Sequence, residues 1–334
     1  MDTSARQVAQ WDNFVLKAGL FLDKTHEHVV QGIDPGGCYK AIWCRDAAYI
    51  LRDWFMSGNV DAALQQASLI WSHQIVPGRE KLVYGRGSPE MKFAPEPVPQ
   101  GNQERFQGAL PTTIYQEGYS EVYGRNPDID STALMISTTS YMLARILKNG
   151  SLTSPGADNP AAEHVVAGIG PETVRPLVQR MLAAVDYLAG RDSDGDGLLE
   201  QDYNEDWMDT ALRAGKIVYS QACWILALKD LSALLAITEK NGHAGKVRGM
   251  AKNAIRAAEE YLWSEHDSCY LDKHHTGNDE KSSGILTQDV AMYFIAVTDP
   301  CRNGAAGSFG DELADIVDRQ LTYARANRAL DAIK

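Results

Sequence analysis

The chain has 334 residues, 44% of them hydrophobic, a length that large single-core folds reach. Its net charge is −12 and its pI about 5.1, which argues against nucleic acid as a partner because phosphate binding requires a basic face. The mean hydropathy is −0.30, and no apolar run approaches the roughly 20 residues of a membrane helix, so the sequence predicts no spanning segment.

The N-terminal segment and the cysteines bear on the cellular compartment. The first residues, MDTSARQVAQWDNF, lack the basic patch and apolar stretch of a signal peptide, so a cytoplasmic location is expected. The cysteines contain no C-x-x-C pair and are odd in number, which favours reduced thiols over a disulfide framework or a zinc site. They are Cys38, Cys44, Cys223, Cys269 and Cys301.

Apolar residues recur at three- and four-residue steps through most of the chain, which predicts helices. The predicted helices cover residues 4–30, 46–57, 60–72, 131–147, 171–190, 217–239, 246–263, 285–297 and 311–326. Acidic residues stand where two of them begin. Asp46 is interpreted as the N-cap of its helix, and Asp130 stands at the entry of the helix that follows it.

Residues 73–130 break the helical pattern, and Gly, Pro, Tyr and Glu are frequent there. A span of this length without a helix is commonly functional. Short strands are expected within it, for example at residues 82–84. We interpret the span as an irregular insertion that shapes a pocket, because a disordered linker would leave its aromatic residues without packing partners. These aromatic residues are Phe93, Phe106, Tyr115, Tyr119 and Tyr123.

About nine helices, joined by alternately short and long loops, predict an all-α domain of helical hairpins over residues 1–334. A closed ring fits better than a solenoid because no sequence repeat is visible. In such a ring the pocket lies where acidic residues enter or leave helices. Asp46, Asp130 and Asp209 each lie beside a predicted helix boundary.

The segment RDSDGDGLLEQDYNEDWMD, residues 191–209, is rich in acidic residues. Its first half alternates aspartates with glycines and resembles the front of a calcium loop, so a structural calcium ion is a candidate ligand. The alternating acids are Asp192, Asp194 and Asp196. The twelfth position is Tyr203 rather than Glu, so the ligand set would close through Glu200 or Asp202. The alternative is an Asp-Gly turn without a metal.

The second half of the segment carries carboxylates beside aromatic residues, a setting that keeps a carboxyl protonated near neutral pH. Asp209 is the candidate general acid. Arg213 lies four residues further on and is expected to hold a substrate or to pair with Asp209; a tight pair would lower the pKa of the acid. Further candidate substrate-binding residues are Glu205, Asp206 and Trp207. The alternative is a solvated acidic loop.

A second group of candidates lies near the start of the chain. Trp43, Arg45 and Asp46 offer a sugar an apolar plate, hydrogen-bond donors and hydrogen-bond acceptors. The alternative is a helix cap and a surface ion pair that contributes little. For Asp130, in the segment IDSTALMI, the alternative is a plain N-cap.

The chain resembles the (α/α)6-barrel glycosidases in the order of three motifs that precede a long apolar helix. These motifs are W-x-R-D at 43–46, D-S-x-A-L at 130–134 and W-M-D at 207–209. These glycosidases include glucoamylase-like enzymes and the amylo-α-1,6-glucosidase domain of glycogen-debranching enzymes. The resemblance implies that Trp43, Arg45 and Asp46 line the first sugar subsite. It also implies that Asp130 binds another hydroxyl and that Asp209 donates the proton. The residue at 221 is Gln, where that group often has a pocket-facing Glu: Gln221 departs from the pattern.

The resemblance further implies an inverting hydrolase acting on α-linked glucosyl residues of glycogen- or starch-like oligosaccharides, without a required cofactor. It implies twelve helices and a second carboxylate, the general base, near the end of the barrel. No motif for this base precedes Lys334, so either the chain stops short or the base comes from elsewhere. Two alternatives remain: a carbohydrate-binding barrel that lacks its base, and a solenoid scaffold without a pocket.

Overall fold

The computed structural model describes residues 41–78, 81–85, 96–115, 118–149, 171–208, 213–238, 242–265, 269–271, 273–274 and 287–298. Its helices are α2 (Cys44–Met56), α3 (Val60–Ser72), α4 (Gln100–Arg105), α5 (Ile129–Asn149), α7 (Pro171–Ala189), α8 (Val218–Thr238), α9 (His243–Tyr261) and α10 (Thr287–Thr298). The helices predicted within the described residues are confirmed to within a few residues at each end. The helices predicted at 4–30 and 311–326 lie outside the described residues, and closure of a ring stays a prediction.

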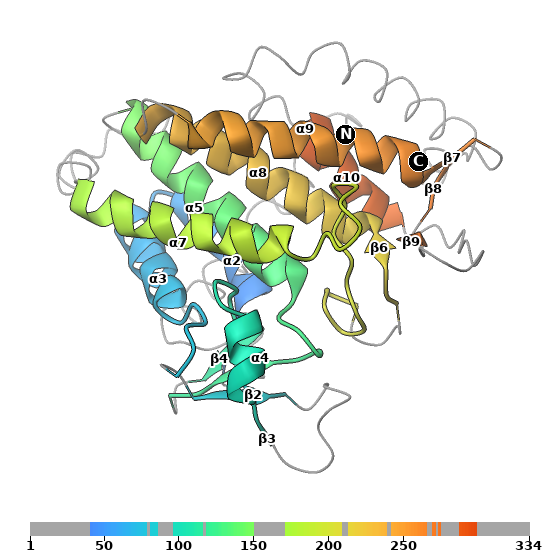
Figure 1. Ribbon diagram of the computed structural model, residues 1–334. Coiled ribbons are helices and arrows are strands. Elements are labelled where there is room, and N and C mark those ends of the chain that lie inside the picture. Colours follow the sequence, from blue (N-terminus) through green and yellow to red (C-terminus); the bar gives the residue numbers. More distant parts are fainter. Residues whose placement is uncertain are drawn as a thin grey trace, which may run out of the picture.

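Helix α8 is the central element of the helical layer (Figure 1). It packs against α5, α9 and α10, and apolar side chains occupy all of its sides, as expected for a helix surrounded by others. By length and composition α8 could cross a membrane, so the prediction that no run approached this length was wrong. In the fold, however, 78% of its apolar window is buried by its neighbours. Its hydrophobicity is therefore that of a core helix.

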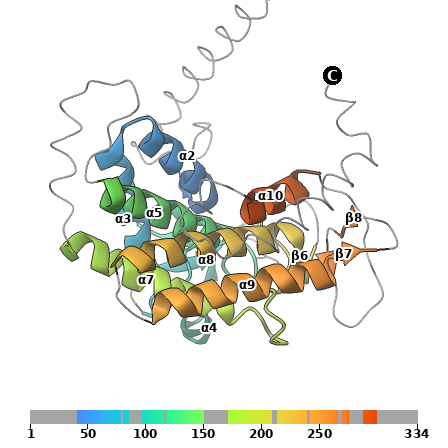
Figure 2. The same cartoon turned by 90° about the horizontal axis from the view of Figure 1, so that it is seen from above.

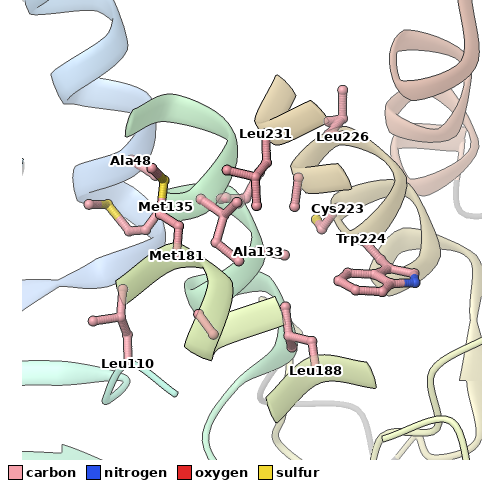
Figure 3. Close-up of a cluster of buried hydrophobic side chains, with 14 of the residues drawn as sticks. Ala48, Leu110, Ala133, Met135, Met181, Leu188, Cys223, Trp224, Leu226 and Leu231 are labelled. Atoms are coloured by element: carbon pink, nitrogen blue, oxygen red, sulfur yellow. The ribbon is translucent and has the colours of Figure 1, made fainter. Parts of the chain in front are cut away.

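The main core lies where α2, α5, α7 and α8 meet (Figure 3). Met135 of α5 and Met181 of α7 are fully buried there, beside Ala48 of α2 and Leu231 of α8. Truncating a buried Leu or Met to Ala commonly costs about 2–5 kcal/mol because a cavity remains. Figure 2 shows α8 and α9 side by side, with α2 and α10 on the other side of α8. This packing holds the N-terminal ends of several helices in fixed relative positions.

Cysteine residues of this core bear on the redox prediction. Cys44, at the start of α2, and Cys223, in α8, are both buried free thiols. Neither residue forms a disulfide among the described residues, and the redox state of the cysteines stays a prediction.

The described residues of 73–130 contain short strands and the helix α4, so the all-α prediction was wrong in this respect. The strands β2 (Leu82–Tyr84), β3 (Glu96–Pro97), β4 (Thr113–Tyr115) and β5 (Ser120–Val122) join β1 (Ala41–Trp43) in one sheet, in the order β1-β4-β5-β2-β3. Neighbours are antiparallel except β2 and β5. Strands of two or three residues are too short to show alternation in a sequence. The expected strand at residues 82–84 is confirmed.

The sheet also explains where α2 begins. Asp46 was expected to be the N-cap, but α2 starts at Cys44, and Trp43 occupies the cap position without a side-chain cap. The backbone N–H of Cys44 donates to the carbonyl of Thr112 at 3.0 Å, so β1 runs into α2 while its pairing with the segment of β4 continues. Asp46 lies in the first turn, where its charge still complements the helix dipole.

Short strands also flank the far end of the helical layer. Strand β6 (Lys216–Ile217) pairs with β9 (Lys273–His274), and β7 (Trp263–Ser264) pairs with β8 (Cys269–Tyr270). Strand β6 leads directly into α8 and so fixes Lys216 beside the acidic segment.

Candidate functional site

The first turns of four helices carry the polar residues of the candidate site. They are Arg45 of α2, Asp130 of α5, Tyr219 of α8 and Asp289 of α10. Buried Cys223, one turn further along α8, has a raised pKa because of its burial and, in addition, because of the charges of Asp130, Asp289 and Asp206. The carboxylates of α5, α10 and the acidic segment therefore all act electrostatically on this one thiol.

Arg45 forms an ion pair between two motifs that are 85 residues apart in sequence. Its Nη1 lies 3.2 Å from Oδ2 of Asp130 and 3.8 Å from Oδ2 of Asp128. Burial by itself would lower the pKa of Arg45, but Asp130, Asp128 and Asp46 outweigh it and raise the pKa. Arg45 is therefore a permanent cation, and the structure brings together three of the predicted site residues, Arg45, Asp46 and Asp130.

Asp130 is fully buried at the start of α5. Burial raises its pKa to about 6 against the opposing charge of Arg45. Its Oδ2 faces Arg45, whereas its Oδ1 is buried without a hydrogen-bond donor among the described residues. An oxygen in this state is suited to accept a hydrogen bond from a hydroxyl group.

Asp128 is a member of this cluster that the sequence analysis missed. It is buried, it accepts hydrogen bonds from the hydroxyls of Thr112 (2.7 Å) and Ser131 (3.3 Å), and its pKa is raised well above the ordinary value by burial and by Asp130. Two buried carboxyls thus share one guanidinium, and burial together with the charge of a neighbouring carboxylate raises the pKa of both. The available signal was the D-x-D spacing with Asp130.

A second ion cluster involves Arg213. Its guanidinium lies 2.8 Å from Oδ2 of Asp206 and 2.6 Å from Oδ2 of Asp289, and all three side chains are buried. The indole N–H of Trp207 donates to Oδ1 of Asp289 at 2.9 Å. The predicted pairing of Arg213 with Asp209 cannot be placed, because residues 209–212 lie outside the described residues. Asp289 was missed, although an acid in the first turn of a predicted helix is the feature that Asp46 and Asp130 share.

Glu205 belongs to a third group of polar residues, in which protein donors bind its carboxylate. Its carboxylate accepts from Arg191 (2.7 Å), from Asn126 (2.6 Å) and from the backbone N–H of Asp202 (2.9 Å). The side chain is fully buried, which raises its pKa, while Arg191 opposes the change. These contacts connect the acidic segment to α7 and to the loop before α5, so we assign Glu205 to positioning.

Gln221 also has a positioning role rather than the pocket-facing one suggested for its position. Its side chain is fully buried in α8. Its amide nitrogen donates to the carbonyl of Leu199, and its amide oxygen accepts from the N–H of the same residue, both at 2.8 Å. Both ends of the amide are therefore used to anchor the acidic segment on α8.

The aspartates predicted to bind calcium do converge, but a lysine lies among them. Ligand atoms of Asp192, Asp194 and Asp196 lie within 4.8 Å of one another. The ammonium of Lys216 lies 2.7 Å from Asp194, bonds to Asp196 and lies 3.6 Å from Glu200. The hydrogen bond from Lys216 is the main reason that the pKa of Asp194 is lowered.

The same aspartates also fold back on their own backbone. Both oxygens of Asp192 accept from the N–H groups of Gly195 and Gly197, two glycines with positive φ of 79° and 100°. The carboxylates suit a hard cation by their chemistry, yet the positive charge of Lys216 already faces two of them. A calcium ion would have to displace that ammonium.

Two partly exposed tryptophans flank the ion clusters. Trp43 lies next to Tyr123, with ring centroids 5.7 Å apart, and Trp207 lies edge-on to Tyr219 at 6.4 Å. The guanidinium of Arg213 lies 5.8 Å from the Trp207 ring. Trp207 therefore lies beside a charged group of the site, and Trp43 precedes Arg45 by two residues in the sequence.

A separate cavity of about 630 Å³ lies behind Glu205, between α4 and the end of α7. Its lining includes Arg105, Asn126, Tyr187 and Arg191 but no residue of the three sequence motifs. We therefore place the candidate site by its converging charged groups and not by this cavity.

Comparison with known proteins adds information on the fold. No protein-family model matches the chain, and no curated protein matches it. The structure is similar to a GH63 mannosylglycerate hydrolase from Thermus thermophilus, solved in complex with glucose. The TM-score is 0.54 at 14% identity, over 84% of this chain and 71% of that one.

Further solved structures are also similar. An uncharacterized conserved protein from Thermus thermophilus gives a TM-score of 0.52 at 14% identity, over 84% of this chain and 70% of that one. A rhamnosidase from Klebsiella oxytoca with rhamnose bound gives 0.49 at 12% identity, over 90% and 55% of the two chains. The likeness to the two Thermus proteins shows a shared helix-rich fold.

Proposed function

We propose that this protein is a glycoside hydrolase that cleaves α-linked glucosyl residues, through α-1,6 or α-1,4 bonds, of glycogen- or starch-like oligosaccharides. The observation that carries the proposal is the 3.2 Å ion pair between Arg45 and Asp130, which joins the W-x-R-D and D-S-x-A-L segments. The fold shared with a mannosylglycerate hydrolase supports the glycosidase class. The glucosyl specificity and the linkages rest on the sequence resemblance.

The ion pair suits the recognition of a hexose by its hydroxyl groups. Arg45 is a fixed donor, and Oδ1 of Asp130, which no described residue bonds, is an acceptor that a sugar hydroxyl would satisfy. Trp43 supplies an apolar surface for a ring face, since it lies two residues from Arg45 and is partly exposed. Asp46 adds a second carboxylate to the same helix end. Such contacts would orient the scissile bond before any proton moves.

In the proposed reaction Asp209 protonates the leaving oxygen as positive charge grows on the anomeric carbon. A second carboxylate activates a water that attacks from the opposite face, which inverts the configuration; the two carboxyls are then roughly 6.5–9.5 Å apart. Asp206 and Asp289 are poor candidates for this base because Arg213 is ion-paired with both. In the sequence, Asp206 and Arg213 stand on the two sides of Asp209, so their ion pair fixes both ends of the segment that carries it.

The test is sugar release from maltose, isomaltose and longer glucans, measured as free glucose, for the wild type and for Asp209→Asn. The proposal expects release by the wild type, loss of at least about 100-fold in the variant, and unchanged sugar binding by isothermal titration. The surface variant Arg125→Ala serves as the matched control. Full activity of Asp209→Asn would remove this residue from its role. Binding without release by the wild type would favour a carbohydrate-binding barrel that lacks its base, and neither binding nor release would favour a scaffold.

The proposed reaction requires no cofactor, and a structural calcium ion at Asp192, Asp194 and Asp196 and a cytoplasmic location are further parts of the proposal. Cell fractionation with an antibody to the chain tests the location. Recovery of the protein from the secreted fraction would contradict it.

A further inference from the structure

One face of the five-stranded sheet carries residues that the helical core does not use. Trp43 of β1 lies opposite Thr113 of β4, and Thr113 lies opposite Glu121 of β5. Residues directly opposite each other share a face, and so do residues two apart in a strand. Tyr115 and Tyr123 therefore belong to the same face as Thr113 and Glu121. We call these residues, with Tyr119, the aromatic face of the sheet.

The opposite face of the sheet packs on the helical core. Ile42, Ile114 and Val122 alternate with the residues of the aromatic face and belong to the main hydrophobic core. By contrast Val83, which lies opposite Glu121 in the register, is buried but lies outside that core. The sheet therefore joins the helical core through this face, and Figure 1 shows it at the edge of the helical layer. On the aromatic face Thr113 and Glu121 are buried, and only the rings are partly exposed.

The aromatic face consists of ring pairs that are partly exposed. The rings of Tyr115 and Tyr119 are stacked, with centroids 4.4 Å apart and planes at 11°, and Trp43 and Tyr123 form a tilted pair at 5.7 Å. All four side chains are neither fully buried nor fully exposed. Rigid amphipathic rings that keep part of their surface in solvent are suited to stacking on a flat ligand with an apolar face and polar edges.

A fixed hydrogen-bond acceptor lies among these rings. Glu121 is only 5% exposed, and its Oε2 accepts from the hydroxyls of Thr113 and Tyr115, both at 2.9 Å. Burial raises the pKa of Tyr115, and Glu121 adds to this effect, so the phenol stays a donor. The residues that define the face thus combine apolar plates with an oriented carboxylate and include no cation, which argues against an anionic ligand.

Gly85 shows how closely the face is packed. A Cβ at this position would lie 3.0 Å from the ring of Tyr123 and 3.4 Å from the carboxyl of Glu121. The absence of a side chain at Gly85 therefore gives these two groups their room. Strand β2 ends one residue earlier, at Tyr84.

We propose that the aromatic face binds the further sugar units of an oligosaccharide whose terminal unit is held at Trp43, Arg45 and Asp130. The two regions are continuous, because Trp43 is the last residue of β1 and Arg45 lies in the first turn of α2. This inference rests on the proposed function for the terminal sugar. It adds the prediction that affinity increases with the length of the oligosaccharide.

The experiment is isothermal titration of the whole chain with glucose, maltose and maltohexaose. We expect maltohexaose to bind the wild type about tenfold more tightly than maltose, and Tyr119→Ala to lose most of this gain while glucose affinity is unchanged. Tyr119→Phe, which keeps the ring, should retain the gain. Tyr203→Ala, which removes an exposed tyrosine of the acidic segment, is the matched control.

The outcomes separate this inference from the proposed function. If the wild type releases sugar but its affinity does not depend on oligosaccharide length, the proposed sugar binding at the aromatic face is rejected and the proposed hydrolase activity is retained. If affinity increases with length but no sugar is released, the hydrolase activity is rejected and binding at the aromatic face is retained. A wild type that binds none of the three sugars would overturn both. Equal losses for glucose and maltohexaose in Tyr119→Ala, together with a lowered melting temperature, would assign Tyr119 to packing and overturn its role as a subsite.

Discussion

Two groups of carboxylates in this protein differ in the partners that they bind. In the acidic loop, which we define as residues 192–200, Asp192 and Asp196 accept from backbone N–H groups two to five residues away. In the ion clusters, Asp130 and Asp289 are buried and face guanidiniums 85 and 76 residues away. Apart from the bonds of Lys216 to Asp194 and Asp196, the loop is thus organised by local contacts, and the clusters by the tertiary fold.

The difference concerns desolvation. Removing the partner of a carboxylate near solvent costs little stability, because water still solvates the charge. Removing the partner of a buried carboxylate costs much more, because the desolvated charge then has no counter-ion. The density of aspartates in the sequence draws attention to the loop, yet the isolated acids at helix starts are the ones that meet at the site. A single acid in the first turn of a helix, where the dipole favours it, is the more useful indicator here.

The largest effect should come from Arg213, which faces two buried carboxylates. Arg213→Ala leaves Asp206 and Asp289 without their cation, and we expect a loss of about 3–5 kcal/mol in the free energy of unfolding. Urea denaturation followed by circular dichroism measures it. Arg213→Lys keeps the charge but not the two-sided geometry and should lose less. A loss below about 1 kcal/mol for Arg213→Ala would mean that the two groups of carboxylates do not differ as described.

The next effect is the pH dependence contributed by Asp130. Its pKa is about 6 in the folded protein, against an ordinary value of 3.8 for an aspartate in the unfolded chain, so the folded state binds the extra proton between these values. The stability from this proton is fully present below about pH 4 and is lost as the pH rises through 6. Relative to Asp130→Asn, the wild type should lose about 2 kcal/mol of unfolding free energy between pH 4 and pH 7.

Unfolding curves at several pH values measure this difference, with Asp202→Asn at a partly exposed position as the control. A difference between wild type and Asp130→Asn that does not change with pH would contradict the assignment of a raised pKa to this carboxyl.

A smaller effect is expected at Lys216, the cation of the acidic loop. Lys216→Met should return the pKa of Asp194 to its ordinary range, because the hydrogen bond from the ammonium is the main cause of its lowering. It should also raise the affinity for calcium by about tenfold, since one competing charge is removed. Isothermal titration of chelator-treated protein with calcium chloride measures the change. Equal affinities in variant and wild type would show that the three aspartates do not act as one ligand set.

The smallest effect is expected for Arg125, which pairs with Asp202 at 3.2 Å while more than half of its side chain is exposed. Arg125→Ala should change the free energy of unfolding by less than about 0.5 kcal/mol. Thermal unfolding at low and moderate salt measures it. A large loss here would show that exposed pairs of this region carry stability as the buried clusters do.

The sequence by itself determined the helices, because their apolar periodicity is a local property that survives without knowledge of the fold. It also indicated Arg45 and Asp130, from motifs whose order resembles a known family. It did not reveal the five-stranded sheet, since strands of two or three residues show no alternation and are defined by partners elsewhere in the chain.

Only the tertiary structure decided which acids meet. The Arg213–Asp289 pair joins the acidic segment to α10, and the double hydrogen bond of Gln221 with Leu199 assigns this residue to anchoring. Such pairings depend on the packing of distant helices around α8 and have no signature within a short window of sequence. The physical reason is that burial, rather than residue type, determines whether a carboxylate is a solvated charge or a member of a site.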